Sequence, residues 1–365
     1  MKPYKLLTPG PLTTTKGVKE EMLFDHCTWD DEYKTITQKI RKDLLNLAHV
    51  CEEEYTSVLM QGSGTFGVES VVSSIIPKHG CLLLLSNGAY GERIAKMCIL
   101  HEIPCIHITQ DYKKIPEAKL ARKALEEHDE ITHIAMIHSE TTTGILNDIV
   151  SIGELSKAFN KTFIVDAMSS FGGIDIHVKD CHIDFLVSSA NKCIQGVPGF
   201  SFILANRKKL IESKGNARCL SLDLYDQWNT MEMDGKWRYT SPTHIVLAFA
   251  KALQELEEEG GISERSKRYY HNMKVLIKEF RNLGFEPYLE DANQGPIITT
   301  FLYPKENFNF KEMYNYIKER GYAIYPGKLT DKETFRIGTI GEIYEADILN
   351  LTRIMKAYVA TLGGR

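Results

Sequence analysis

The stretch SSANK, from Ser188 to Lys192, ends the apolar run IDFLV, from Ile183 to Val187, and is soon followed by GVPG, from Gly196 to Gly199. A short apolar run bounded by small and polar residues predicts a buried strand. The lysine would then lie at the edge of a sheet, where the glycines let neighbouring backbone approach closely. Because a lone lysine is usually a solvated surface residue, its role depends on what else reaches the same edge.

Composition bounds the class of protein. The chain has 365 residues, of which 43% are hydrophobic and 25% are charged, so it can bury a large core, and its length predicts two domains. The net charge of -4 gives no electrostatic reason to expect nucleic acid or an anionic membrane as partner. An anionic substrate would have to be bound by local groups.

The cysteines and the N-terminus favour a cytoplasmic protein. The eight cysteines include no C-x-x-C pair, and no His/Cys cluster has zinc-ligand spacing. We therefore expect reduced thiols and no metal site. The first residues, MKPYKLLTPGPLTTT, lack the apolar core of a signal peptide, and no apolar stretch approaches the length of a membrane span.

Strand and helix patterns alternate from about residue 56 to residue 204. Near-continuous apolar strands in such an alternation predict an α/β fold with a mostly parallel sheet covered by helices on both faces. Ligands of these sheets bind at the carboxyl ends of the strands. Small or polar residues follow five of the predicted strands, at Gln61 to Thr65, Ser86 to Tyr90, His138 to Thr143, Asp166 to Ser169 and Ser188 to Lys192.

The remaining patterns divide the chain into parts. Residues 1–20 are predicted to form an N-terminal arm and residues 21–261 a large domain. The Gly260-Gly261 pair ends a predicted helix, so we place the boundary there and expect a smaller α+β domain over residues 262–365. The stretch from Leu220 to Thr243 has no regular pattern and is predicted to be irregular.

The segment GSGTFG, from Gly62 to Gly67, satisfies G-x-G-x-x-G between a predicted strand and a predicted helix. A dinucleotide site would need an acidic residue after the next strand, but that strand ends in SNG at Ser86. The same geometry can hold one phosphate through backbone N–H groups, the helix dipole and the hydroxyls of Ser63 and Thr65. Glycines that only form a turn are the third interpretation.

Asp166 places a carboxylate at the mouth of another buried strand. A buried acid needs a partner, and a protonated pyridine nitrogen would supply one, whereas a helix cap is the plainer alternative. Pyridoxal phosphate (PLP) chemistry needs a lysine, an acid for the ring nitrogen and an anion site. Lys192, Asp166 and the GSGTFG segment together therefore predict a PLP site.

Longer motifs extend this interpretation over nearly the whole chain: TPGPLTT, HSETTTG, DAMSSFGG, SSANKCIQGVPGFSF, SLDLYDQW, KWRYTSPTH, YPGK and FRIGTIGEIY. With these motifs the sequence resembles the class-V, fold-type I aminotransferases, and most closely their 2-aminoethylphosphonate:pyruvate branch. The resemblance implies a ping-pong transamination in which 2-aminoethylphosphonate and pyruvate give phosphonoacetaldehyde and L-alanine. An alanine:glyoxylate or serine:pyruvate aminotransferase is the alternative, because the cofactor motifs are shared.

The resemblance also implies roles for residues at matching positions. Lys192 would form the Schiff base with PLP, and Asp166 would contact the ring nitrogen. The phosphate would lie in a cradle formed by Ser63, Gly64 and Thr65.

Four further positions match cofactor contacts of the family. Thr141 would lie near the ring oxygen O3', while Tyr90 and Met168 would cover opposite faces of the ring. Thr240 matches a threonine that reaches the phosphate from the neighbouring subunit, which implies a homodimer with shared active sites. Without the resemblance, core packing or turn hydroxyls would explain all four.

Arg336 lies in a predicted strand between apolar neighbours, where a guanidinium forms a structural ion pair or binds an anion. The resemblance implies that it binds the substrate carboxylate, and it could serve the phosphonate in the other half-reaction. Lys328 is a weaker candidate for the same anion, since a solvated loop lysine is the plainer interpretation. A cysteine desulfurase would need a reactive cysteine on a late mobile loop, and nothing around the last cysteine, Cys219, stands out.

Overall fold

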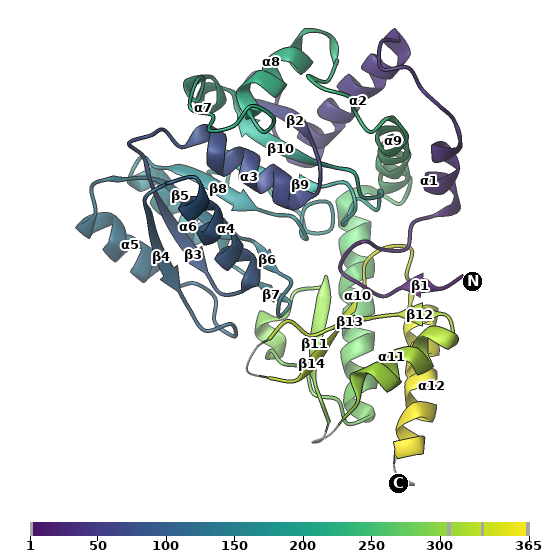
Figure 1. Ribbon diagram of the computed structural model, residues 1–365. Helices are drawn as coiled ribbons and strands as arrows, with labels where there is room; N and C mark the ends of the chain where they lie inside the picture. The colour runs from purple at the N-terminus through teal and green to yellow at the C-terminus, as the bar shows by residue number, and fades with distance from the viewer. Residues whose placement is uncertain (1–2, 305–307, 330–331, 363–365) are drawn as a thin grey trace.

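The computed structural model describes residues 3–304, 308–329 and 332–362 of the chain. Its two parts lie one above the other in Figure 1, with the central sheet above and the C-terminal elements below. Helix α10 (Gly261–Asn282) runs from the upper part down into the lower one. The boundary that we propose from the sequence falls at the first residue of this helix.

A seven-stranded sheet forms the centre of the upper part. Its order is β2-β10-β9-β8-β5-β3-β4, and β10 is antiparallel to both of its neighbours while the other pairs are parallel. The carboxyl ends of the five strands that precede the predicted polar segments therefore meet at one edge. The strands are β2 (Tyr55–Gln61), β3 (Cys81–Ser86), β4 (Cys105–Thr109), β5 (Ile131–Ile137), β8 (Thr162–Asp166), β9 (Phe185–Ser189) and β10 (Phe200–Asn206).

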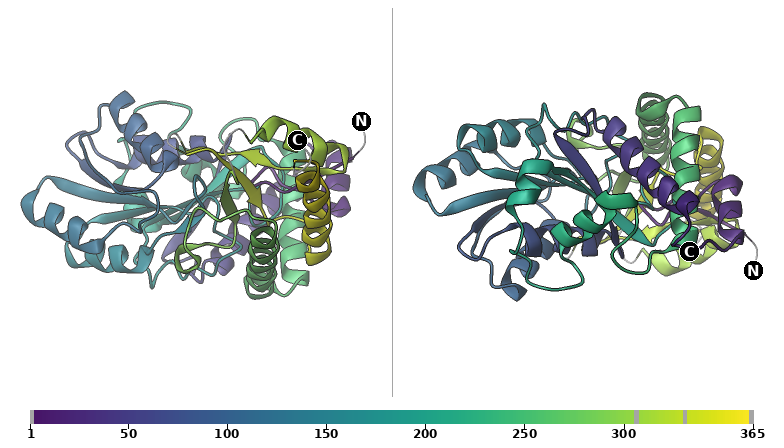
Figure 2. Two further views of the ribbon diagram at one scale, coloured as in Figure 1. Left: turned by 90° about the horizontal axis from the view of Figure 1, so that it is seen from below. Right: turned by 90° about the horizontal axis from the view of Figure 1, so that it is seen from above.

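Helices cover both faces of this sheet (Figure 2). Successive strand residues point to opposite faces, so Leu83 packs in one apolar cluster and Leu82 in the other. Burial on both faces explains why the strands are apolar throughout. The first cluster includes residues of α2 (Asp31–Leu47), α5 (Ala118–Glu127), α6 (Ile149–Ala158) and α9 (Thr243–Glu258), and the second includes residues of α3 (Gly64–Ile75), α4 (Ala89–Leu100), α7 (Arg207–Glu212) and α8 (Leu224–Asp234).

The lower part packs two small sheets against three helices around its own apolar cluster. Leu7 of the N-terminal segment belongs to this cluster, because β1 pairs in parallel with β12. The segment therefore joins the C-terminal part before it passes the edge of the large sheet. The elements are β1 (Lys5–Leu6), β11 (Ile298–Leu302), β12 (Tyr322–Ala323), β13 (Tyr325–Pro326), β14 (Thr334–Gly338), α10, α11 (Phe310–Glu319) and α12 (Glu345–Leu362).

Three further pieces complete the described secondary structure, one of them the short 3₁₀ helix Asp291–Asn293 before β11. The hairpin of β6 (Ser139–Glu140) and β7 (Ile145–Leu146) follows β5, and α1 (Lys16–Glu20) is followed by a short 3₁₀ turn. One prediction from the sequence was wrong. The stretch from Leu220 to Thr243 contains helix α8, which Asp223 caps by accepting a hydrogen bond from the backbone N–H of Asp226 (3.1 Å).

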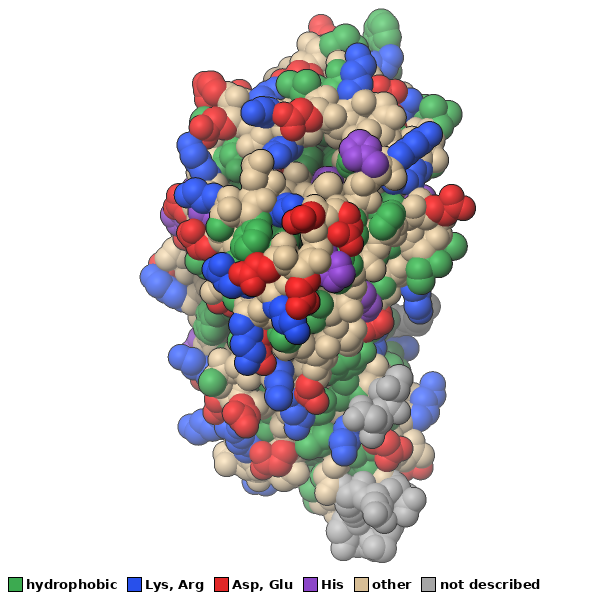
Figure 3. Space-filling view, turned by 90° about the vertical axis from the view of Figure 1, so that its left-hand side faces the viewer, with side chains coloured by type: hydrophobic (Ala, Val, Ile, Leu, Met, Phe, Trp, Pro, Cys, Tyr) green, Lys and Arg blue, Asp and Glu red, His purple; other side chains and the backbone are tan. Residues whose placement is uncertain are grey.

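The surface agrees with the small net charge. Lys and Arg side chains are interspersed with Asp and Glu on the face shown in Figure 3, without a large patch of one sign. Within the described ranges, no helix combines the length and the apolar character needed to cross a bilayer.

Candidate active site

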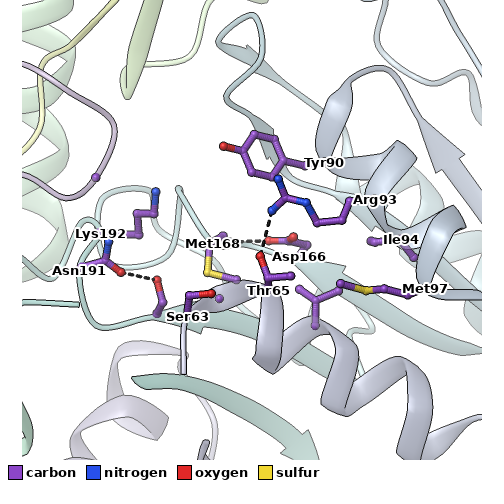
Figure 4. Close-up of a pocket in the computed structure, with 14 residues that line it drawn as sticks. Ser63, Thr65, Tyr90, Arg93, Ile94, Met97, Asp166, Met168, Asn191 and Lys192 are labelled. Atoms are coloured by element: carbon purple, nitrogen blue, oxygen red, sulfur yellow. Dashed lines mark hydrogen bonds between the residues drawn. The ribbon is translucent and has the colours of Figure 1, made fainter. Parts of the chain in front are cut away.

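A pocket of about 200 Å³ lies at the carboxyl edge of the large sheet (Figure 4). The polar segments after β2, β8 and β9 line it together with the start of α4. Seven residues that the sequence predicted for the site are in its wall: Ser63, Gly64, Thr65, Tyr90, Asp166, Met168 and Lys192. Thr141, Thr240 and Arg336 are not among the described residues that line it.

Lys192 enters the pocket from the turn that follows β9, opposite Tyr90 and Arg93 in Figure 4. Its amine donates a hydrogen bond to the carbonyl oxygen of Pro9 (2.9 Å), so the N-terminal segment fixes the position of the lysine at the sheet edge. Burial lowers the pKa of the amine, and the neighbouring Tyr90 and Asp166 oppose that effect. A lowered pKa leaves more of the amine neutral and therefore nucleophilic.

Gly10 shows how closely the N-terminal segment approaches this lysine. Its φ of +120° lies in the region that glycine tolerates, and a Cβ there would lie 2.9 Å from the amine nitrogen of Lys192. The sequence predicted a turn near Gly10 but not its contact with the lysine. A turn of Thr-Pro-Gly-Pro at the start of the chain gives no signal of which distant residue it will meet.

Asp166 ends β8 and is almost completely buried, with 7% of its surface exposed. One carboxylate oxygen accepts a hydrogen bond from the backbone N–H of Met168 (2.9 Å). Burial raises the pKa of this carboxyl to about 6, although that hydrogen bond and the charge of Lys192 lower it. A buried carboxylate that faces a pocket is stabilised when a cation binds opposite it.

Helix α3 opens directly at the pocket and provides an anion site. Ser63 occupies its N-cap position without a side-chain capping bond, and the first amide groups of a helix have no intrahelical acceptor. A Cβ at position 64 would lie 2.1 Å from the Sδ atom of Met168, so any larger residue there would have to displace the Met168 side chain. The twelve-residue helix also directs the positive end of its dipole at the pocket.

Arg93 adds a positive charge to this end of the pocket, and the sequence prediction missed it. Its guanidinium donates a hydrogen bond to the Thr65 hydroxyl (2.9 Å) and lies 4.9 Å from the centre of the Tyr90 ring. Tyr90 and Arg93 lie three positions apart on α4, so they share one helical face. This spacing could have predicted from the sequence that Arg93 lies beside Tyr90 in the site.

Tyr90 joins the pocket to the C-terminal part. Its hydroxyl accepts a hydrogen bond from the amine of Lys328 (2.8 Å), which also lies 4.2 Å from the ring centre. Burial acts to raise the pKa of Tyr90, but the charge and hydrogen bond of Lys328 outweigh it, so the pKa falls below its ordinary value. Lys328 is therefore a partly buried residue held against Tyr90 rather than a fully solvated loop lysine.

Arg336 lies behind Tyr90 and is buried, with 4% of its surface exposed. It donates hydrogen bonds to the carbonyl oxygens of Thr141 (2.8 Å) and Pro326 (3.0 Å). Burial lowers its pKa, and no carboxylate pairs with it among the described residues within salt-bridge distance. Its substrate-binding role stays a prediction.

Glu140 anchors the same region and was also missed from the sequence. Its buried carboxylate accepts hydrogen bonds from Thr142 N (2.9 Å), the Thr142 hydroxyl (2.6 Å) and Tyr90 N (3.2 Å). Burial raises its pKa despite these bonds. This carboxylate fixes the start of α4, and hence Tyr90, relative to the β6–β7 hairpin.

Thr240 lies outside this pocket. It is exposed on the segment between α8 and α9, next to Ser241, whose hydroxyl is 2.6 Å from that of Tyr33 on α2. Its contact with a cofactor bound in a neighbouring subunit stays a prediction.

The pocket as a whole can hold PLP. It combines a buried amine, a buried carboxylate that faces the cavity, and the N-terminus of α3 with Ser63, Gly64 and Thr65 in the wall. These are the three groups that PLP needs for its aldehyde, ring nitrogen and phosphate.

Comparison with known proteins agrees with this geometry. The model of the family described as aminotransferase class-V matches residues 27–338. The chain belongs to the class-V aminotransferases. Enzymes of this family depend on PLP, and the chain is accordingly a PLP-dependent aminotransferase with a fold-type I architecture.

Similar curated proteins are named 2-aminoethylphosphonate--pyruvate transaminase. The protein from Lysinibacillus sphaericus is 56% identical over 359 residues, which cover 98% of each chain. A protein from Bacillus cereus is 56% identical over 349 residues, covering 95% of this chain and 96% of its own length.

Two solved structures show the shared fold. Ureidoglycine-glyoxylate aminotransferase from Bacillus subtilis superposes with a TM-score of 0.91 at 19% identity, covering 99% of this chain and 94% of that one. Pyridoxamine-pyruvate aminotransferase from Mesorhizobium loti gives 0.90 at 21% identity, covering 100% and 94%.

Proposed function

We propose that this chain transfers the amino group of 2-aminoethylphosphonate to pyruvate, which gives phosphonoacetaldehyde and L-alanine. The identity of 56% over 98% of the chain to a protein named for this reaction carries the proposal. When bound, PLP supplies an electron-accepting ring that lets the amino group pass between two substrates in successive half-reactions.

Lys192 moves the proton in each half-reaction. With PLP bound, the Lys192 amine would be the group that removes the proton from the amine-bearing carbon of 2-aminoethylphosphonate and passes it to the cofactor. The lowered pKa of the buried amine supports this role, because a general base must be neutral to accept a proton.

Asp166 holds a proton on the ring nitrogen. Opposite a pyridinium the carboxylate gains the charge partner that its burial calls for, so the ionised acid and the protonated nitrogen stabilise each other. Ser63, Gly64 and Thr65 bind the phosphate through the N-terminus of α3, while Tyr90 and Met168 orient the ring and Thr141 its O3' oxygen.

Arg336 binds the anionic end of both substrates, the phosphonate of the donor and the carboxylate of pyruvate. Its guanidinium has five N–H donors, and the two bonds to Thr141 and Pro326 hold it in one orientation. Lys328, which contacts Tyr90, adds a second cation to the site. Two cations favour a phosphonate, which carries more negative charge than a carboxylate.

The active enzyme is a homodimer with shared active sites. The exposure of Thr240 and its separation from the pocket of its own chain support this part of the proposal. Mixing Lys192→Ala subunits, which should be inactive, with Thr240→Ala subunits, which should be impaired, tests it, since a hybrid dimer contains one intact site. About a quarter of all sites should then be active after random exchange. Activity that stays at the level of the separate variants would contradict shared sites, as would an active monomer in sedimentation.

We place the enzyme in the cytoplasm, where its thiols would stay reduced. All eight cysteines are free, which supports this assignment. Fractionation of cells that express the chain would test it, with recovery in the membrane or extracellular fraction as the contrary result.

Steady-state kinetics test the reaction itself. The purified holoenzyme should form L-alanine from pyruvate with 2-aminoethylphosphonate as donor, with a kcat/KM well above that for L-serine or for alanine with glyoxylate. A preference for alanine with glyoxylate, or for serine, would move the function to the alanine:glyoxylate or serine:pyruvate aminotransferases while leaving Lys192 and the fold unchanged.

A further inference from the structure

Three potential metal ligands meet on the surface of the large domain, outside the PLP pocket. His49, Asp175 and His177 each offer one ligand atom, and these atoms all lie within 4.8 Å of one another. The two oxygens of Asp175 are divided between the histidines, with Oδ1 2.7 Å from Nε2 of His49 and Oδ2 3.6 Å from Nε2 of His177. His49 and Asp175 are separated by 126 positions in the sequence, so the fold alone brings them together.

The backbone fixes both segments that carry these ligands. His49 directly follows the C-cap of α2, and the N–H of Val178 donates to the carbonyl oxygen of Ala48 (3.2 Å), which joins the helix end to the loop between β8 and β9. In that loop Ile176 and Val178 are buried. Because side chains alternate along an extended segment, Asp175 and His177 both point outward on the same side.

The ring of His177 has the second partner that metal ligands usually have. Its Nε2 faces Asp175, while its Nδ1 lies 3.5 Å from Oδ2 of Asp180. A histidine bound to a metal through one nitrogen nearly always donates its other N–H to a carboxylate or carbonyl, which fixes its tautomer and orientation. The imidazole rings of His49 and His177 stack face to face, with centroids 3.9 Å apart and an angle of 5° between their planes, so one ring must tilt for both nitrogens to point at one ion.

The spacing fits a small divalent ion. Zinc binds imidazole nitrogen and carboxylate oxygen at about 2.0–2.2 Å, which separates tetrahedral ligand atoms by about 3.3 Å. The three ligand atoms all lie within 4.8 Å of one another, so binding an ion would change these separations by at most about 1.5 Å. Water would complete the coordination, since all three residues are exposed.

We propose that His49, Asp175 and His177 form a binding site for one divalent transition-metal ion per chain, with Asp180 as the residue that orients His177. An ion there ties the end of α2 to the loop between β8 and β9. Because the ligands come together only in the folded chain, the ion stabilises the folded state.

Calorimetric titration of the chelator-treated holoenzyme with zinc chloride tests the site, together with thermal unfolding. We expect one ion per chain and a melting temperature that rises with zinc. The variant His177→Ala should bind at least about tenfold more weakly and lose the rise, whereas Asp180→Asn should keep the stoichiometry and weaken binding by roughly tenfold. Both variants should keep wild-type transamination, which shows that they fold.

His128→Ala is the matched control. His128 is 41% exposed and His49 is 42% exposed, and each lies beside a single carboxylate oxygen at hydrogen-bond distance, but His128 has no third ligand in the described cluster. The variant His128→Ala should bind zinc with the affinity of the wild type. Equal affinity in the wild type and His177→Ala, or no saturable binding in the wild type, would overturn the proposal. A thiolate charge-transfer band with cobalt(II) would also overturn it, since that band would assign the ion to a cysteine.

Discussion

Replacing Asp166 with asparagine should stabilise the cofactor-free protein while it removes the group that PLP needs. In the folded chain, burial raises the pKa of this carboxyl from 3.8 to about 6. The folded state therefore keeps a proton that the unfolded state has released between these pH values. The free energy of unfolding therefore falls as pH rises through this window. Above about pH 6 the folded state has lost all of the stabilisation that the retained proton on Asp166 provides.

The magnitude follows from the pKa difference. At about 1.4 kcal/mol per pKa unit, ionising Asp166 in the folded protein costs about 3 kcal/mol at neutral pH. Asparagine has a similar shape, can accept the hydrogen bond from Met168 N and never ionises. Cofactor-free Asp166→Asn should therefore exceed the wild type in free energy of unfolding by up to about 3 kcal/mol at pH 7.5, and by progressively less toward pH 4.

Urea unfolding of both proteins between pH 4.5 and pH 7.5 measures this difference. Asp184→Asn is the matched control, because Asp184 is a partly buried carboxyl outside the pocket whose pKa burial also raises and whose carboxylate accepts a hydrogen bond from Phe163 N (2.9 Å). The stability advantage of both variants over the wild type should grow with pH, but only Asp166→Asn should lose PLP affinity and turnover. A difference that does not change with pH, or a wild type that is the more stable protein at pH 7.5, would refute the reasoning.

Three further substitutions test the site. Lys192→Ala should still bind PLP but lose multiple turnover by at least about a thousandfold, because no other group moves the proton; a wild-type rate would remove Lys192 from the mechanism. Arg336→Ala should lower kcat/KM for both substrates by roughly 10- to 100-fold, the value of a charged hydrogen bond, and unchanged constants would exclude it from the site. Gly64→Ala forces Met168 aside and should weaken PLP binding by about 1–3 kcal/mol in a fluorescence titration; unchanged affinity would mean that Met168 can move freely.

The sequence predicts the sheet edge well for a physical reason. Strands buried on both faces must be apolar throughout, so the polar residues that end them, such as Asp166 and Lys192, stand out in the chain. Parallel strands share one carboxyl edge, so we could predict that these residues lie together without knowing the order of the strands in the sheet.

Other features depend on contacts between distant segments, which no local pattern records. Helix α8 was missed because its sequence, LYDQWNTMEMD, mixes polar and apolar residues without a clear helical period. Which of its side chains become buried depends on the sheet that the helix packs against. The contact of Gly10 with Lys192 and the cluster of His49 with Asp175 and His177 likewise join segments far apart in sequence. The rule of metal-ligand spacing finds only ligands close in sequence, so it predicted no metal site.

One measurement tests the central claim most directly: a visible absorbance scan of the purified holoenzyme mixed separately with 2-aminoethylphosphonate, L-alanine, L-serine and glycine. We predict that 2-aminoethylphosphonate and L-alanine alone discharge the absorption band of the bound cofactor. A response to alanine and serine without one to the phosphonate would contradict the proposed substrate.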